Sequence, residues 1–130
     1  MKRSYLLVII SSVLMLVIGI ASAMIQSDPV FESATTNLKS NKQVTFSAVT
    51  SSEQNYIKVT KVELYKQNSN SSWSYVCNLP VPAHISMHNT LYGATKDYSD
   101  YIGAGTYRIY TTFCADGHNI SRYSNVKTFQ

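Results

Sequence analysis

The sequence predicts an all-β fold, a small antiparallel β-sandwich, and three observations predict it. Apolar and polar residues alternate with a period of two along several short segments. Polar clusters typical of turns separate these segments. Ten of the 130 residues are tyrosine, only 14% are charged, and no segment after residue 23 shows helical spacing. Because tyrosine favours strands and helical bundles carry more charge, a charge-rich helical fold is excluded.

The first 23 residues match the three-part layout of a secretory signal peptide. Lys2 and Arg3 provide the positive start, residues 5–20 form an uncharged and mostly apolar run, and Ala21-Ser22-Ala23 supplies the small residues of a cleavage site. An uncleaved membrane anchor is the alternative, but the apolar run is at the short end for crossing a bilayer. We therefore expect cleavage after Ala23 and a secreted, extracellular protein without stable membrane insertion.

Removal of residues 1–23 lowers the net charge of the chain. Lys2 and Arg3 leave with the signal peptide, so nine of the 11 lysines and arginines remain against all seven acidic residues, about +2 instead of +4. Nucleic-acid binding needs a clustered basic surface. The densest basic group, residues 58–66, contains Glu63. We therefore expect no nucleic-acid partner.

Residues 24–41 show little periodicity and are predicted to form an irregular N-terminal arm. An edge strand near Val30 and Phe31 is the alternative. The sandwich domain would then span residues 42–130. Its first strand is predicted over residues 42–49, where apolar and polar side chains alternate.

Residues 56–66 form the longest β-rich run of the sequence. Its first two aliphatic residues lie in one phase of a two-residue repeat, and its last two lie in the other. Because a regular strand cannot change phase, we expect a bulge near Thr60-Lys61. The four aliphatic residues are Ile57, Val59, Val62 and Leu64.

A polar cluster at residues 67–72 follows this run and predicts a turn. The pattern on its two sides predicts a β-hairpin of residues 61–66 and 73–79. Pro80 ends the second strand, because proline has no N–H group to donate to a sheet. Residues 83–102 show no clear period.

The clearest predicted strand spans residues 106–115. Asp116-Gly117 follows it and is a strong hairpin turn signal. Residues 123–129 alternate again and are predicted to return as the final strand. One side of the strand at 106–115 is mostly apolar and is expected to face the core: Tyr107, Ile109, Thr111 and Phe113.

Residues 101–115 carry a resemblance to a known fold. The run Gly105-Thr106-Tyr107-Arg108-Ile109-Tyr110 is similar to the penultimate strand of fibronectin-III-like and immunoglobulin-like sandwiches. Trp73 together with Cys77 and Cys114 resembles the aromatic residue that packs on an inter-sheet disulfide there, although in immunoglobulin domains the first cysteine precedes the tryptophan on another strand. The resemblance implies a two-sheet sandwich. The whole chain also resembles small exported proteins of Gram-positive bacteria, which implies export.

Cys77 and Cys114 are the two cysteines of the chain. An even number of cysteines in an exported protein indicates a disulfide. Closing the 37-residue separation between them would stabilise the fold by about 4 kcal/mol on the chain-entropy account. Two free buried thiols, or a link between two chains, are the alternatives.

Tyr92, Tyr98 and Tyr101 cluster in a polar segment beside Asp97 and Asp100. An exposed ring flanked by hydrogen-bonding groups suits a sugar face or a protein surface, because it is stiff and amphipathic. These three tyrosines are therefore the predicted binding residues. The alternative is that their rings pack on strands and send their hydroxyl groups to water.

Signals for a metal or for catalysis are weak in this sequence. His84 and His88 have a spacing that binds zinc on a helix, but no glutamate lies between them and the nearby prolines disfavour a helix. Asp97 and Asp100 lack the dense acidic spacing of a calcium loop. Neither a G-x-S-x-G motif nor a glycine-rich phosphate loop is present. We expect no metal, no cofactor and no enzymatic activity.

The sequence therefore predicts a secreted, non-catalytic binding or interaction module that acts at the cell surface or in the medium, with a glycan or protein partner. A secreted antagonist, such as a bacteriocin-like toxin or a hydrolase inhibitor, is the alternative. An enzyme is a third hypothesis, which a deep pocket lined by His84 and His88 would favour.

Overall fold

The computed structural model describes residues 28–130, so the predicted signal peptide at 1–23 lies outside the described residues. The described part contains no helix, and therefore no helix that could cross a membrane. The all-β prediction is confirmed. The seven strands are β1 (Phe31–Leu38), β2 (Gln43–Gln67), β3 (Trp73–Leu79), β4 (Ile85–Asp97), β5 (Gly105–Ala115), β6 (His118–Tyr123) and β7 (Lys127–Phe129).

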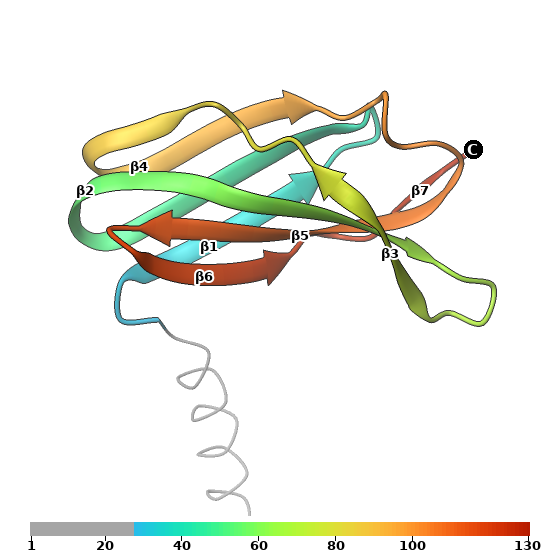
Figure 1. The fold of residues 1–130 in the computed structure, drawn as a ribbon, viewed down its shortest axis with the longest axis horizontal. Coiled ribbons are helices and arrows are strands. Elements are labelled where there is room, and N and C mark those ends of the chain that lie inside the picture. Colours follow the sequence, from blue (N-terminus) through green and yellow to red (C-terminus); the bar gives the residue numbers. More distant parts are fainter. Residues whose placement is uncertain (1–27) are drawn as a thin grey trace, which may run out of the picture.

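Strand β2 organises the whole sheet, because its two halves have different neighbours (Figure 1). Its first half, residues 43–50, lies between β1 and β4. Its second half, residues 57–67, pairs with β5 on one edge, and on the other edge with the start of β4 at residues 57–58 and with β3 at residues 62–67. β5 in turn pairs with β6 and β7, and every pairing is antiparallel. The two strands predicted at 42–49 and 56–66 are therefore parts of one 25-residue strand.

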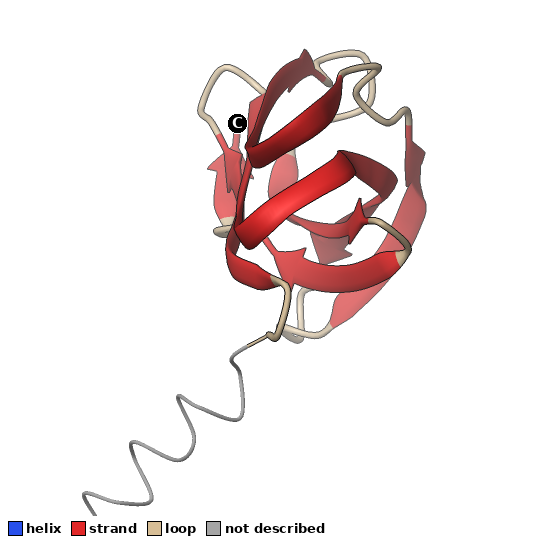
Figure 2. Cartoon of the chain, turned by 90° about the vertical axis from the view of Figure 1, so that its left-hand side faces the viewer, coloured by secondary structure: helices blue, strands red, loops and turns tan. Residues whose placement is uncertain are grey.

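The sheet curls around a common interior, as the view in Figure 2 shows. Curling brings the free edge of β1 close to β6 and the residues that follow it. Asn125 spans this junction at one end: its side chain accepts a hydrogen bond from the Leu38 N–H at 2.8 Å and donates one to the Leu38 carbonyl at 2.9 Å. Asp28 and His118 span the other end, with 2.8 Å between Oδ2 and Nε2. Side chains, rather than a backbone ladder, hold these two edges together.

The predicted bulge in the long β-rich run is confirmed. The register between β2 and β5 shifts between Val59 and Lys61. This shift turns the aliphatic residues on both sides of it towards the same interior. All four are at most 3% exposed: Ile57, Val59, Val62 and Leu64.

The predicted hairpins are also confirmed, with one change at the end of the chain. Asp116 and Gly117 have φ values of 45° and 83°, and positive φ at both positions makes the tight turn that joins β5 to β6. The final strand predicted at 123–129 is wrong in its bounds, because β6 starts directly after the turn and ends at Tyr123. Ser124 interrupts the ladder: its hydroxyl accepts a hydrogen bond from the Ile109 N–H at 2.8 Å.

The N-terminal arm predicted to be irregular at residues 24–41 contains a strand, β1 (Phe31–Leu38), within its described part, and its first four residues lie outside the described residues. β1 pairs along its length with the first half of β2. Phe31 and Leu38 are 2% and 0% exposed, so this segment contributes to the core. The structure therefore contains an edge strand near Val30 and Phe31, which was the alternative prediction for this segment.

The predicted disulfide is absent, since Cys77 and Cys114 are both free. They lie on opposite edges of β2: Cys77 is opposite Leu64 and Cys114 is opposite Lys58. Six residues along a strand cover roughly 20 Å. A disulfide needs Cα atoms within about 7 Å, so this register keeps the two thiols too far apart.

Candidate functional site

The outer surface of the β3–β2–β5–β6 half of the sheet carries the strongest candidate site. Val62 and Leu64 point into the core, so the alternate β2 residues Glu63 and Tyr65 point outward. The strand register then places β3 and β5 side chains beside them, and β6 side chains beside those of β5. We call this surface the aromatic face and define it by six residues: Tyr65, Trp73, Tyr75, Arg108, Tyr110 and Tyr123.

The rings of the aromatic face lie in contact with one another. Tyr65 is 5.9 Å from Tyr75 and 6.3 Å from Tyr123, measured between ring centroids, with both pairs edge to face. Tyr110 and Tyr123 are 4.5 Å apart. Such pairs each stabilise their arrangement by about 0.5–1.5 kcal/mol, so the rings form a stiff layer. Tyr75 and Tyr123 are nevertheless 53% and 49% exposed.

Arg108 lies in the middle of this layer. Its Cζ atom is 4.3 Å from the centroid of the Trp73 indole and 3.9 Å from that of the Tyr123 ring. The planar guanidinium is therefore in contact with two aromatic rings, an arrangement favoured by attraction between the cation and the π electrons. The rings hold the guanidinium in place, and its N–H groups, which point outward in its plane, are the part that can bind.

Polar groups lie between and beside the rings. The Tyr75 hydroxyl donates a hydrogen bond to Asn78 Oδ1 at 3.0 Å, and Lys61 Nζ is 3.5 Å from Glu63 Oε1. Burial of the Tyr65 hydroxyl, together with the negative charge of Glu63, raises the pKa of Tyr65. This hydroxyl therefore stays protonated at neutral pH and can donate a hydrogen bond. The face offers apolar rings and hydrogen-bonding groups within the same small area.

The structure does not bring the predicted tyrosines together on a surface. Tyr92 and Tyr98 are 4% and 0% exposed, so the expectation that their rings are exposed is wrong. Tyr92 donates to the His84 carbonyl at 3.1 Å and Tyr98 donates to the Pro80 carbonyl at 2.6 Å. Burial raises the pKa of both tyrosines. Tyr101 is 47% exposed but lies on the loop after β4, outside the aromatic face.

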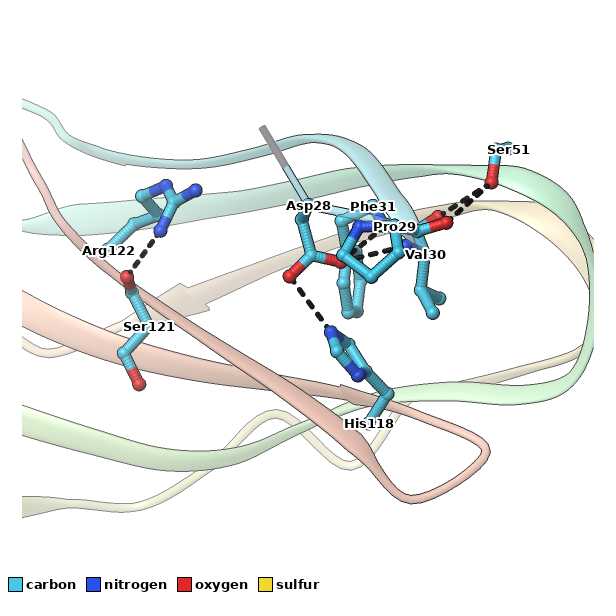
Figure 3. Close-up of polar contacts among 8 residues, drawn as sticks. All are labelled: Asp28, Pro29, Val30, Phe31, Ser51, His118, Ser121 and Arg122. Carbon is cyan, nitrogen blue, oxygen red and sulfur yellow. Dashed lines mark hydrogen bonds and ion pairs between the residues drawn. The ribbon is translucent and has the colours of Figure 1, made fainter. Parts of the chain in front are cut away.

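A hollow of about 450 Å³, separate from the aromatic face, lies where β1 meets β6. Figure 3 shows its polar contacts: Asp28 Oδ1 accepts hydrogen bonds from the N–H groups of Val30 and Phe31, and Asp28 Oδ2 meets His118. Burial raises the pKa of Asp28, but the hydrogen bonds and the positive charge of His118 outweigh burial and lower it overall. These polar groups bind one another, so we interpret the hollow as a joint between strand edges.

The histidines do not form a metal site. Within residues 28–130, no group of three or more histidine, cysteine, aspartate or glutamate side chains is placed to hold a metal ion. The His84 ring lies 5.4 Å from the Tyr92 ring, measured between centroids, and His88 lies within strand β4 with φ 47°.

Sequence reasoning missed the aromatic face, although part of its signal was visible. Arg108 and Tyr110 alternate along β5 in the phase opposite to its core residues, whereas Trp73 and Tyr75 share the sequence phase of the inward-facing Cys77 and Leu79 and turn outward only through the irregularity at Val76. Aromatic residues in a solvent-facing phase indicate a surface kept for binding. Only the strand register shows that these two strands flank β2 and that Tyr65 lies between them.

Comparisons with known proteins give no relative: no family model, no curated protein and no solved structure matches this chain.

Proposed function

We propose that this protein is an exported, non-catalytic binding module that recognises a glycan with its aromatic face. The observation that carries the proposal is the layer of contacting, partly exposed rings on one half of the sheet. Exposing rings to water is unfavourable, and a fold that needs them only for stability can bury them. The pyranose ring of a sugar stacks on an aromatic ring through its C–H groups, while its hydroxyls bind polar neighbours.

A glycan fits this face better than a protein partner does. Protein interfaces bury apolar anchors at their centre, surrounded by a polar rim. Here, the side chains that the strand register pairs at outward positions are aromatic, polar or charged, and Val76, beside Tyr75 in the irregular part of β3, is the one exposed aliphatic residue among strands β3, β5 and β6. Polar groups also lie inside the ring layer, as the hydrogen bond from Tyr75 to Asn78 shows. A sugar needs this mixture because each of its faces carries both C–H and O–H groups.

We further propose that the curled sheet is a sandwich related to fibronectin-III-like and immunoglobulin-like domains, and that the protein acts at the cell surface or in the medium. The strand at 105–115 and the predicted signal peptide support these proposals. Mass spectrometry of the protein recovered from culture medium tests export: a chain that begins at Met24 supports it, and a cell-retained chain with residues 1–23 intact contradicts it.

A glycan array with purified protein tests the proposed ligand class. We expect selective binding to one group of saccharides, which Trp73→Ala and Tyr75→Ala reduce by about tenfold or more, as expected for loss of a central interface ring. Tyr101→Ala is the matched control, because Tyr101 is about as exposed as Tyr75 but lies elsewhere. Binding that depends on Tyr101 and not on Trp73 would contradict the proposed surface. Capture of a single protein, with no saccharide bound, would contradict the ligand class.

A further inference from the structure

Arg108 is the cation of the aromatic face, and it has no carboxylate partner within ion-pair distance among residues 28–130. Glu63 points outward on the same half of the sheet, opposite Tyr110, but it pairs with Lys61 at 3.5 Å, so the positive charge of Arg108 has no ion-pair partner within the described residues. A ligand with complementary charge would carry an anionic group at that position.

The donors of Arg108 are also unused within the described residues. Its Nε atom is buried and has no hydrogen-bond partner there. A buried unpaired donor costs about 1–3 kcal/mol, and because Nε is closed to solvent, a ligand would bind the terminal nitrogens Nη1 and Nη2. These two nitrogens are not among the buried unpartnered atoms.

The stacking geometry fixes how an anion would approach. Trp73 and Tyr123 both lie against the guanidinium, and its N–H groups point outward in its own plane, so an oxyanion that binds these groups meets Arg108 along its edge. Edge-on approach lets two parallel N–H groups bind the two oxygens of a carboxylate. The surrounding rings then lie where the sugar that bears this carboxylate would stack.

We propose that the glycan bound by the aromatic face is acidic, with a sugar carboxylate bound by the guanidinium edge of Arg108 while the sugar ring stacks on the neighbouring aromatic rings. This inference rests on the proposed function and names the ligand class of the same surface. Loss of the acidic group would remove a charge-assisted hydrogen bond and leave the ring contacts in place.

Oligogalacturonate and its methyl ester form the direct test, because they have the same sugar rings and differ in the charge of the carboxyl groups. A second pair, hyaluronate oligosaccharides and their methyl esters, covers a different acidic backbone. We expect the unmodified protein to bind at least one acid about tenfold or more tightly than its ester, the usual size of a charge-assisted pair. Higher salt should reduce this difference. Equal affinity for acid and ester in both pairs would overturn the proposal.

Variants of Arg108 then test whether this residue causes the preference for the acid over its ester. Arg108→Gln should abolish the preference for the acid and leave the binding of the ester nearly unchanged, whereas Arg108→Lys should restore only part of it, since lysine has no planar pair of donors. Arg122→Gln is the control, because it changes the net charge equally on β6 but outside the aromatic face. A preference for the acid that survives Arg108→Gln would overturn the proposal. The acid–ester comparison on the unmodified protein does not depend on how these variants fold.

The outcomes separate the two proposals. If ester and acid bind equally and Trp73→Ala weakens both, the face binds glycans but the acidic class is wrong. If no saccharide binds, both proposals are wrong. Dextran sulfate that competes fully with the acid, together with no effect of Tyr75→Ala, would show simple charge attraction and would also overturn the inference.

Discussion

The two halves of β2 pack on one core but present opposite outer surfaces. The first half, with β1 and β4, exposes mostly small polar side chains, with the 57% exposed Leu91 at one end, and we call the small polar residues the polar face: Thr35, Asn37, Thr45, Ser47 and Thr95. The second half, with β3, β5 and β6, exposes the aromatic face. Small polar residues are the ordinary solvent-facing choice for an antiparallel sheet. Since both halves have the same core to cover, core packing does not explain the rings, and this difference is what points to binding.

The largest expected effect is on the core beneath the polar face. Tyr98 packs edge to face on Phe46 of β2, 6.5 Å between centroids, and is fully buried. We expect Tyr98→Ala to lower the free energy of unfolding by about 3–5 kcal/mol, as other buried aromatic truncations do. Denaturant unfolding measures it, and both halves should unfold in one transition. Tyr101→Ala is the control and should cost about 1 kcal/mol or less. Separate unfolding of the two halves would contradict a shared core.

The next effect concerns the connection between the two halves at Asn125. This side chain pairs with both the N–H and the carbonyl of Leu38, which belongs to the polar half. We expect Asn125→Ala to destabilise the fold by about 1–3 kcal/mol, because both backbone groups lose their partners. Amide hydrogen exchange at Leu38 should become faster in this variant. Asn119→Ala, at an exposed position of β6, is the control, and an equal loss there would mean that Asn125 has no special role.

Some features of the fold could be predicted from the sequence and others could not. The bulge near Thr60-Lys61 and the tight turn at Asp116-Gly117 depend on neighbouring residues, so a local pattern predicts both. The break after Tyr123 depends on Ser124 bonding back to Ile109, and Asn125 reaches Leu38 across 87 residues. A two-residue repeat in the sequence indicates that alternate side chains face opposite sides of the sheet. It does not indicate which strands become neighbours.

The candidate site shows the same limit. Tyr92 and Tyr98 lie in a polar segment, which suggested exposed rings, yet the pairing of β4 with β2 directs Tyr92 inward opposite Ala48. The aromatic face assembles residues from four strands. The sequence assigns Tyr110 to the outward phase of its strand, but the outward direction of Trp73 and Tyr75 depends on the register shift beside Val76, and the contacts of the rings with one another and with Arg108 follow only from long-range register.

A third prediction sharpens the comparison between the two outer surfaces. Tyr123 contacts Tyr65, Tyr110 and Arg108 and is half exposed. We expect Tyr123→Ala to weaken saccharide binding by about tenfold, because the guanidinium loses one of its stacking rings. Thr45→Ala on the polar face should leave binding unchanged. Isothermal titration with the saccharide selected on the array measures both, and equal effects would remove the distinction between the surfaces.

The smallest expected effect is a pH dependence at the junction of β1 and β6. The folded state lowers the pKa of Asp28 below its usual value of 3.8, so its contribution to stability is present above pH 3.8 and is lost as pH falls through the folded-state pKa. We expect Asp28→Asn to cost about 1 kcal/mol or less at pH 6, since His118 is partly exposed. Unfolding measured from pH 6 to pH 2 should show the two proteins converging in acid. A difference that grows as pH falls would contradict this assignment.

Amide chemical-shift mapping by NMR tests the central claim most directly, because β2 contains both surfaces in one strand. The protein is titrated with whichever acid it binds more tightly, oligogalacturonate or hyaluronate, and, separately, with the neutral methyl ester of that acid. The account predicts that at least one of these ligands shifts amide signals of β3, β5, β6 and residues 61–67 of β2, with residues 43–49 unaffected. Shifts confined to residues 43–49, β1 and β4, or no shifts with either ligand, would contradict it.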